Sequence, residues 1–124
     1  MEQNPDRSTL LLRLVNPKWD QDGSPSSQAF RPMNDDDLTV SFYDGSMITP
    51  EDAFHHFTEE LGNVAIYVVE VPTKVFLDEG LTVDFDGMPY PSHVNVDYSM
   101  IQSRNERKRI SRRIKNHCKV VYRP

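Results

Sequence analysis

The sequence has a single cysteine and no apolar run long enough to cross a bilayer. Cys118 alone cannot form an intramolecular disulfide or a multi-cysteine zinc site. A membrane-spanning helix needs about 20 consecutive apolar residues, and none of the apolar runs approaches that length. Residues 1–8 are polar and carry acid at Glu2 and Asp6, which is not the pattern of a signal peptide. These absences predict a soluble, cytoplasmic protein with no membrane partner.

Glycine is also scarce, and the sequence has no motif of a known catalytic or cofactor-binding class. The five glycines lie mostly at predicted turns, so they cannot build a glycine-rich phosphate loop. There is no GxSxG motif, no HExxH motif and no order of Ser, His and acid with a recognised spacing. We therefore expect no cofactor, and we favour a non-enzymatic protein.

The length fits one domain, over residues 1–124. A chain of 124 residues can bury a single hydrophobic core. Apolar residues make up 37% and charged residues 27%, which fits a compact domain with polar segments rather than a disordered chain. The polar segments are an N-terminal tail, residues 1–8, and a loop, residues 16–28.

The apolar periodicity predicts an α+β fold. Leu38, Val40 and Phe42 alternate with polar residues, which is the period of a half-buried strand. Thr49 followed by Pro50 is typical of a helix start. The order β-β-α-β-(β)-β-α-β predicts one mostly antiparallel sheet with two main helices packed on it. The predicted strands are 8–15, 38–43, 64–71, a brief 81–85, 93–98 and 118–122, and the predicted helices are 50–61 and 103–117.

The charge is distributed unevenly along the chain. Residues 104–123 hold nine of the 14 Lys and Arg and one of the 19 Asp and Glu, a net charge of +8, which leaves −13 on residues 1–103. Clustered cations bind polyanions because each neutralised phosphate releases counterions, and the planar fork of arginine suits phosphate. The predicted helix 103–117 therefore favours an acidic macromolecular partner, either a nucleic acid or an acidic protein. The residues that we expect to bind are Arg104, Arg107, Lys108, Arg112, Arg113 and Lys115.

Two other interpretations of this helix stay open. Its charges can pair with the acidic body, including Asp35 to Asp37, or they can bind a small phosphorylated ligand. The acidic body itself suggests a third role for the whole protein, that of an immunity or antitoxin-like protein that masks a basic partner. The sequence leaves the oligomeric state open.

An enzymatic alternative rests on histidines and acids. His56 precedes Glu59 and Glu60 at helical spacing, as an acid-base pair requires. His93 and Asp97 share one face of a predicted strand, and a second predicted strand carries two acids. If these strands are neighbours, the cluster could bind a divalent ion or activate water in a small hydrolase or nuclease. The catalytic candidates are His56, His93 and Asp97, and the metal candidates are Asp84 and Asp86. The plainer interpretation, which we adopt, is a polar outer face with no metal and no catalytic residue.

Several short stretches resemble a pattern in a family of small uncharacterised bacterial proteins. The resemblance covers about residues 29–124 and ends with a Lys/Arg-rich helix and Val-Tyr-Arg-Pro. It implies a bacterial, cytoplasmic, stand-alone domain and no particular activity. The stretches are Phe30-Arg31-Pro32, Leu38-Thr39-Val40 with Asp44-Gly45, Pro50-Glu51-Asp52-Ala53 through His56, and Pro91 to His93 continuing into Val96-Asp97-Tyr98.

Overall fold

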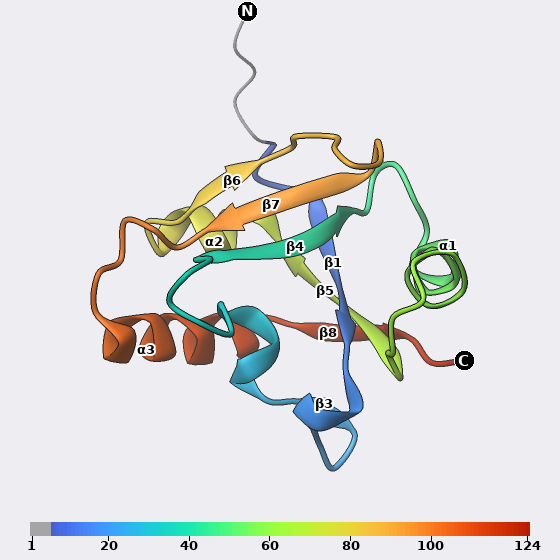
Figure 1. Cartoon of the computed structure of the whole chain (residues 1–124), viewed down its shortest axis with the longest axis horizontal. Helices are drawn as coiled ribbons and strands as arrows, with labels where there is room; N and C mark the ends of the chain where they lie inside the picture. The colour runs from blue at the N-terminus through green and yellow to red at the C-terminus, as the bar shows by residue number, and fades with distance from the viewer. Residues whose placement is uncertain (1–5) are drawn as a thin grey trace, which may run out of the picture.

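A six-stranded antiparallel sheet forms the centre of the computed structural model, which describes residues 6–124 (Figure 1). The strand order is β6-β7-β4-β1-β5-β8, and every neighbouring pair is antiparallel. Residues 1–5 of the predicted N-terminal tail lie outside the described part. The strands are β1 (Leu10–Val15), β4 (Thr39–Asp44), β5 (Tyr67–Pro72), β6 (Thr82–Asp84), β7 (His93–Asp97) and β8 (Lys119–Tyr122).

Helices lie on both sides of this sheet. The predicted α+β class, with one antiparallel sheet and two main helices packed on it, is confirmed. The predicted loop over residues 16–28 contains two short 3₁₀ helices, η1 (Pro17–Trp19) and the start of η2 (Ser27–Phe30), and a small hairpin of β2 (Asp20–Gln21) and β3 (Ser24–Pro25). The other helices are α1 (Pro50–His55), its π-helical continuation η3 (His56–Glu60), α2 (Thr73–Asp78) and α3 (Arg104–Lys115).

Side-chain caps explain where the two main helices begin. The hydroxyl of Thr49 accepts a hydrogen bond of 3.1 Å from the backbone N–H of Asp52 at the start of α1. Ser103 caps α3 in the same way, through a 3.2 Å bond from the N–H of Glu106. Arg113 and Lys115 lie in the last turn of α3, where cations stabilise the helix dipole. The α-helix predicted to run to Leu61 instead changes to π geometry at His56.

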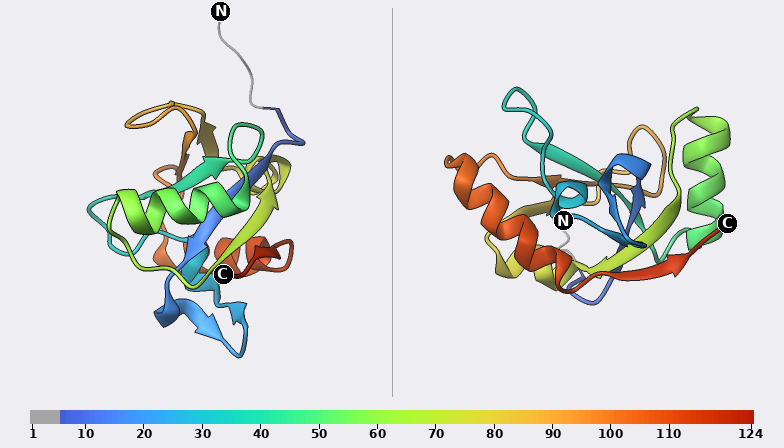
Figure 2. Two further views of the ribbon diagram at one scale, coloured as in Figure 1. Left: turned by 90° about the vertical axis from the view of Figure 1, so that its right-hand side faces the viewer. Right: turned by 90° about the horizontal axis from the view of Figure 1, so that it is seen from below.

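The sheet separates a larger core from a smaller one. The larger core joins one face of the sheet to α3, α2 and η2, and buried aromatic residues such as Phe30, Phe42 and Phe76 fill it. The smaller core joins the opposite face to α1 around Leu12 and Tyr43. Figures 1 and 2 show α1 and α3 on opposite sides of the molecule. Helix α1 contacts β1, β5 and β8, and within residues 6–124 no helix covers the part of the smaller-core face formed by β6, β7 and β4.

Arg13 is the one cation in the otherwise apolar strand β1. It lies two residues from Leu11 and from Val15, so its side chain points to the same face of the sheet as these two residues of the larger core. Its Nε donates to the carbonyl oxygen of Ala29 over 2.8 Å, and its Nη1 donates to that of Ser41 over 3.0 Å. No carboxylate within residues 6–124 pairs with it. Burial lowers the pKa of Arg13 to about 10, so the guanidinium stays charged at neutral pH.

Arg13 forms its hydrogen bonds where the backbone pairing between β1 and β4 ends. Strands β1 and β4 pair only at Leu11 with Asp44 and at Leu12 with Tyr43. Beyond these pairs, Arg13 connects β1 to the backbone of β4 with its side chain. Its guanidinium carbon also lies 5.0 Å from the ring centre of Trp19, which fixes the predicted loop against the body.

We predict that Arg13→Met destabilises the protein by about 2 kcal/mol, because two hydrogen bonds from a charged donor are lost and two carbonyl groups lose their partner. Urea unfolding followed by circular dichroism measures the change. The control is Arg7→Met, since Arg7 pairs with Asp78 on the exposed surface, where an ion pair contributes about 0–1 kcal/mol. Equal losses for the two variants would contradict the connecting role of Arg13.

Candidate functional site

Helix α3 presents fewer free cations than its sequence suggests. Arg104 and Arg107 both pair with Asp35, the second over 2.9 Å, and Arg113 pairs with Glu79 over 2.8 Å. Arg107 is only 7% exposed, so it does not belong to an open face. The structure therefore neutralises three of the six predicted binding residues within the chain, as the self-pairing interpretation anticipates.

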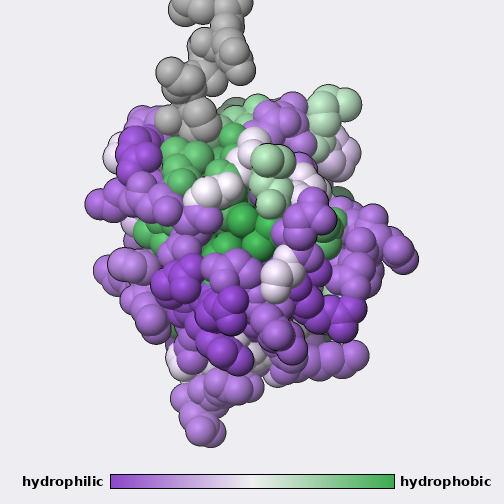
Figure 3. All heavy atoms as spheres, turned by 90° about the vertical axis from the view of Figure 1, so that its left-hand side faces the viewer, coloured by the Kyte–Doolittle hydropathy of each residue, from purple (hydrophilic) through white to green (hydrophobic). Residues whose placement is uncertain are grey.

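The other three predicted binding residues stay unpaired within residues 6–124. They are Lys108, Arg112 and Lys115, none of which forms an ion pair there. Arg31 lies close to them, because its Nη1 donates to the hydroxyl of Ser111 on α3 over 3.2 Å. Burial, and then the charge of Arg112, lowers the pKa of Arg31. Figure 3 shows the side of the molecule that lies to the left in Figure 1, with hydrophilic side chains over its lower half.

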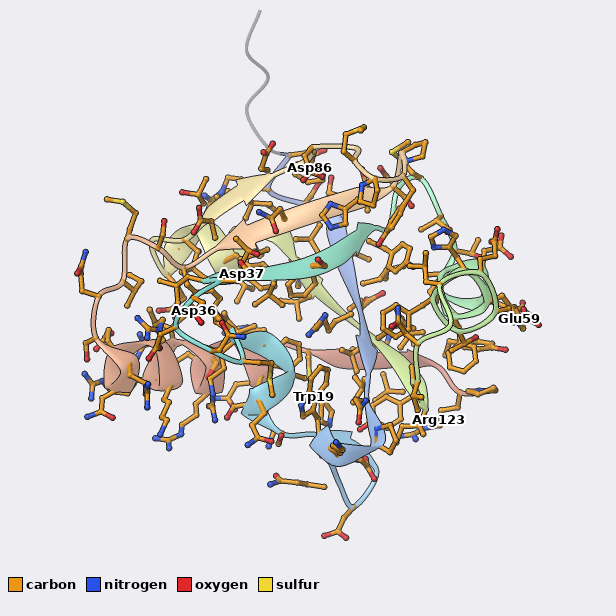
Figure 4. The ribbon with its side chains drawn as sticks, in the orientation of Figure 1. Trp19, Asp36, Asp37, Glu59, Asp86 and Arg123 are labelled. Carbon is orange, nitrogen blue, oxygen red and sulfur yellow. The ribbon has the colours of Figure 1, made fainter. Side chains whose placement is uncertain are left out.

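A second group of polar residues lies on the open face of β6, β7 and β4. The register places Ser41 opposite Asn95, and Asn95 opposite Asp84, in one row across the three strands. His93 lies opposite Tyr43, in the next row. Strands β6 and β7 are thus neighbours, which is the condition that the enzymatic alternative set. Figure 4 places Asp86 beyond β7, away from Asp36 and Asp37 on the α3 side of the sheet.

Three side chains of this face form a continuous hydrogen-bonded chain. Oδ1 of Asp86 lies 2.6 Å from Nδ1 of His93, and Nε2 of His93 lies 3.1 Å from Oγ of Ser41. Because a carboxylate can only accept, it holds the imidazole proton on Nδ1, and Nε2 is left to accept from the serine hydroxyl. His93 is 9% exposed, whereas Ser41 is exposed. The order of acid, imidazole and hydroxyl is the one that activates serine nucleophiles.

Aromatic side chains enclose the imidazole of His93 and lead to a second histidine. The ring of Tyr90 stands edge-to-face against His93, with centres 5.3 Å apart, and against His56, with centres 4.5 Å apart. The hydroxyl of Tyr43 lies 2.7 Å from Nδ1 of His56. Burial, and then the neighbouring Tyr90, raises the pKa of Tyr43, so its hydroxyl keeps its proton. The π-helical turn begins at His56, and such turns are frequent at functional sites.

The remaining candidates do not join this chain. Asp97 lies on the same strand as His93, and its carboxylate accepts a 2.7 Å bond from the backbone N–H of Ser99. Asp84 lies opposite Asn95 and makes no side-chain hydrogen bond or ion pair within residues 6–124. In the described part of the chain, no group of three or more His, Cys, Asp or Glu is arranged to hold a metal ion.

Within residues 6–124, His56 forms no ion pair with Glu59 or Glu60, although their spacing along the helix allows one. It is His55 whose Nδ1 lies 2.8 Å from the carboxylate of Glu59. His56 turns toward Tyr43 on the sheet instead. The two adjacent histidines therefore point in different directions, one to solvent and one to the aromatic cluster.

Sequence reasoning missed Ser41, Tyr43 and Tyr90. Ser41 is a polar position of a correctly predicted alternating strand, and only the pairing of β4 with β7 brings it to His93. Tyr90 lies in the proline-rich segment before β7, which has no periodicity to analyse. The signal for Ser41 was thus its place on the polar face of its strand.

No protein-family model, no curated protein and no solved structure matches this chain. Within residues 6–124, no helix is both long enough and apolar enough to cross a membrane.

We predict that the pKa of the Asp35 carboxyl lies below its ordinary value of 3.8, because the hydrogen bond from Arg104 favours the charged form, with Arg107 adding to the effect. A lowered folded-state pKa means that the stabilisation is complete above the ordinary value and is lost as the pH falls through the folded-state value. Carbon-13 NMR of the carboxyl group measures the titration. Arg104→Gln should shift the midpoint toward 3.8, and an unchanged midpoint would contradict the pairing.

Proposed function

We propose that this protein is a small hydrolase in which Ser41 is the nucleophile, His93 the general base and Asp86 the group that orients the imidazole. The observation that carries the proposal is the hydrogen-bonded chain from Asp86 through His93 to the exposed hydroxyl of Ser41. The distance of 3.1 Å between Nε2 and Oγ is within the reach of direct proton transfer.

The proposed reaction is acyl transfer to serine, followed by hydrolysis. Oγ of Ser41 attacks the carbonyl carbon of an ester while Nε2 of His93 takes the hydroxyl proton, and Asp86 stabilises the imidazolium. The imidazolium returns this proton to the leaving alkoxide as the ester bond breaks. Water, deprotonated by His93, then attacks the acyl-serine, the bond between the acyl carbon and Oγ breaks to release the acid, and the imidazolium returns the proton to Oγ of Ser41. Asn95 lies opposite Ser41, where its amide can donate to the developing oxyanion.

We predict that a fluorophosphonate probe labels the protein at Ser41 and that short p-nitrophenyl esters are hydrolysed. Ser41→Ala should abolish labelling, and Asp86→Asn should lower the hydrolysis rate by about 10³–10⁴-fold, because the imidazole loses the carboxylate that fixes its proton. Peptide mass spectrometry locates the label, and an ester assay gives the rate.

The matched control is Ser24→Ala, which removes an exposed hydroxyl on β3 that forms no hydrogen bond with Asp86, His93 or Ser41. Its labelling and rate should equal those of the parent. Thermal unfolding of each variant separates loss of reactivity from loss of fold. Absence of both labelling and hydrolysis in the folded parent protein would refute the proposal.

A second proposal keeps the interaction role of α3, now limited to Lys108, Arg112 and Lys115. It is supported by the absence of ion pairs at these three cations in the described residues, and by the presence of Arg31 beside them. The partner that we propose is a nucleic acid or an acidic protein. We also propose a cytoplasmic location, which the single Cys118 supports, since it can form no intramolecular disulfide. The proposed bacterial origin rests on the family resemblance alone.

We predict that replacing Lys108, Arg112 and Lys115 together with Glu removes binding to duplex DNA at low salt. The salt dependence of the parent should correspond to about three phosphate contacts, a slope near −2.7 in log K against log salt. Fluorescence anisotropy with duplex DNA, single-stranded DNA and RNA measures both. The control is Arg109→Glu, since Arg109 is already paired with Glu106. If the parent binds none of the three, the nucleic-acid branch is wrong.

A further inference from the structure

A pocket of about 540 Å³ lies between α3 and the segment that joins η2 to β4. Four cations line it, namely Arg31, Arg104, Arg107 and Lys108. The acids that line it are Asp35 and Asp36. Positive charge therefore exceeds negative charge at this place, although the whole protein carries a net charge of −5.

The deepest cation of the pocket is held in a fixed position. Nη1 of Arg107 donates to the carbonyl oxygens of Ile101 and Gln102, over 2.7 and 3.1 Å. Its side chain is only 9% exposed. The other terminal nitrogen, Nη2, points to the carboxylate of Asp35 over 2.9 Å. A buried guanidinium held in this way is ready to bind an anion, because little conformational entropy is left to lose.

Asp35 occupies the position that an anionic ligand would take. One of its carboxylate oxygens accepts from Arg107 and the other accepts from Arg104. Each arginine thus gives one charge-assisted hydrogen bond to the carboxylate, and the two cations share one anion. Asp35 belongs to the same molecule, so it acts as an internal occupant of the pocket.

In the described part of the chain, two further cations face the pocket without an acidic partner. Arg31 is held by the hydroxyls of Ser27 and Ser111, over 3.1 and 3.2 Å. Lys108 makes no ion pair within residues 6–124. One carboxylate from Asp35 thus satisfies two of the four cations and leaves two for a ligand of higher charge.

The internal contact is weak enough to be exchanged. The side chain of Asp35 is 54% exposed and that of Arg104 is 68% exposed, and ion pairs of this kind contribute about 0–1 kcal/mol. A phosphate monoester carries a charge of about −1.5 to −2 and three acceptor oxygens. It can contact more of the four cations than a single carboxylate can, so the exchange favours the phosphate.

We infer that this pocket binds the phosphate group of a phosphorylated ligand through Arg104 and Arg107, and that Asp35 is a built-in competitor that fills the site when the ligand is absent. Arg31 and Lys108 neutralise the remaining charge of the phosphate. This phosphate site is independent of the proposed hydrolase site, because none of the residues that line the pocket takes part in the hydrogen bonds that join Asp86, His93 and Ser41.

The test is titration of the full chain with inorganic phosphate and pyrophosphate at low salt, followed by ¹H–¹⁵N NMR of the arginine side chains. The signals of Arg104 and Arg107 should shift. Asp35→Asn should increase the affinity by about two- to fivefold, since the lost competitor was worth at most about 1 kcal/mol. Arg107→Lys should reduce the affinity by about tenfold or more, because lysine lacks the planar group that donates to two backbone carbonyls and to the anion at the same time. Arg104→Lys tests the same point at an exposed position, where folding is not at risk.

Matched controls separate the pocket from general charge effects. Asp37→Asn makes the same charge change in the same segment at a residue that does not line the pocket, and Arg109→Gln removes a cation of α3 that lies outside the pocket and pairs with Glu106. Both should change phosphate affinity less than twofold. Ser41→Ala should bind phosphate like the parent, so failure of the hydrolase leaves this result intact. The inference is overturned if Asp37→Asn increases the affinity as much as Asp35→Asn, if Arg104→Lys does not weaken binding, or if the parent binds neither anion.

Discussion

The arrangement of this protein depends on Arg13. Strand β1 is central in the sheet, but it stays paired with β4 for only two residue pairs. Arg13 continues the connection by donating to the carbonyl oxygen of Ser41. A cation on the larger-core face of the sheet thus holds the backbone of the residue whose hydroxyl meets His93 on the opposite face. The same guanidinium binds Ala29 in η2, so it also fixes the segment that leads to the anion pocket.

The sequence was informative where structure depends on neighbours along the chain. Alternation located β4 and β7, and the Thr49 cap located the start of α1, because both signals are local. The meeting of Ser41 with His93 depends on the register between two strands that are far apart in the chain, which no local signal specifies. The contact of His56 with Tyr43 was missed for the same reason, since it joins a helix to a strand rather than two positions of one element.

Charge counting was limited in a related way. The +8 segment was evident from the sequence, but its availability depends on contacts across large separations, such as that of Arg113 with Glu79. Most of these pairs are exposed, so they contribute little to stability and still reduce the charge that a partner meets. The basic helix therefore does not present a continuous positive surface. It carries one buried arginine, Arg107, and three cations that form no ion pair within residues 6–124, namely Lys108, Arg112 and Lys115.

The two proposed sites differ in what holds their side chains in position. The hydroxyl of Ser41 is positioned by sheet register and by Arg13, which are features of the rigid body of the fold. The anion pocket is closed by a surface segment whose half-exposed Asp35 is held by one exposed arginine, Arg104, and one buried arginine, Arg107, so we expect its occupancy to respond to solution anions and salt. Because the sites lie on opposite sides of the sheet and share no side chain, a ligand in the pocket has no direct route to the charge on His93. Binding and hydrolysis are thus expected to vary independently, which is the behaviour of a domain that carries two separate surfaces rather than one composite active site.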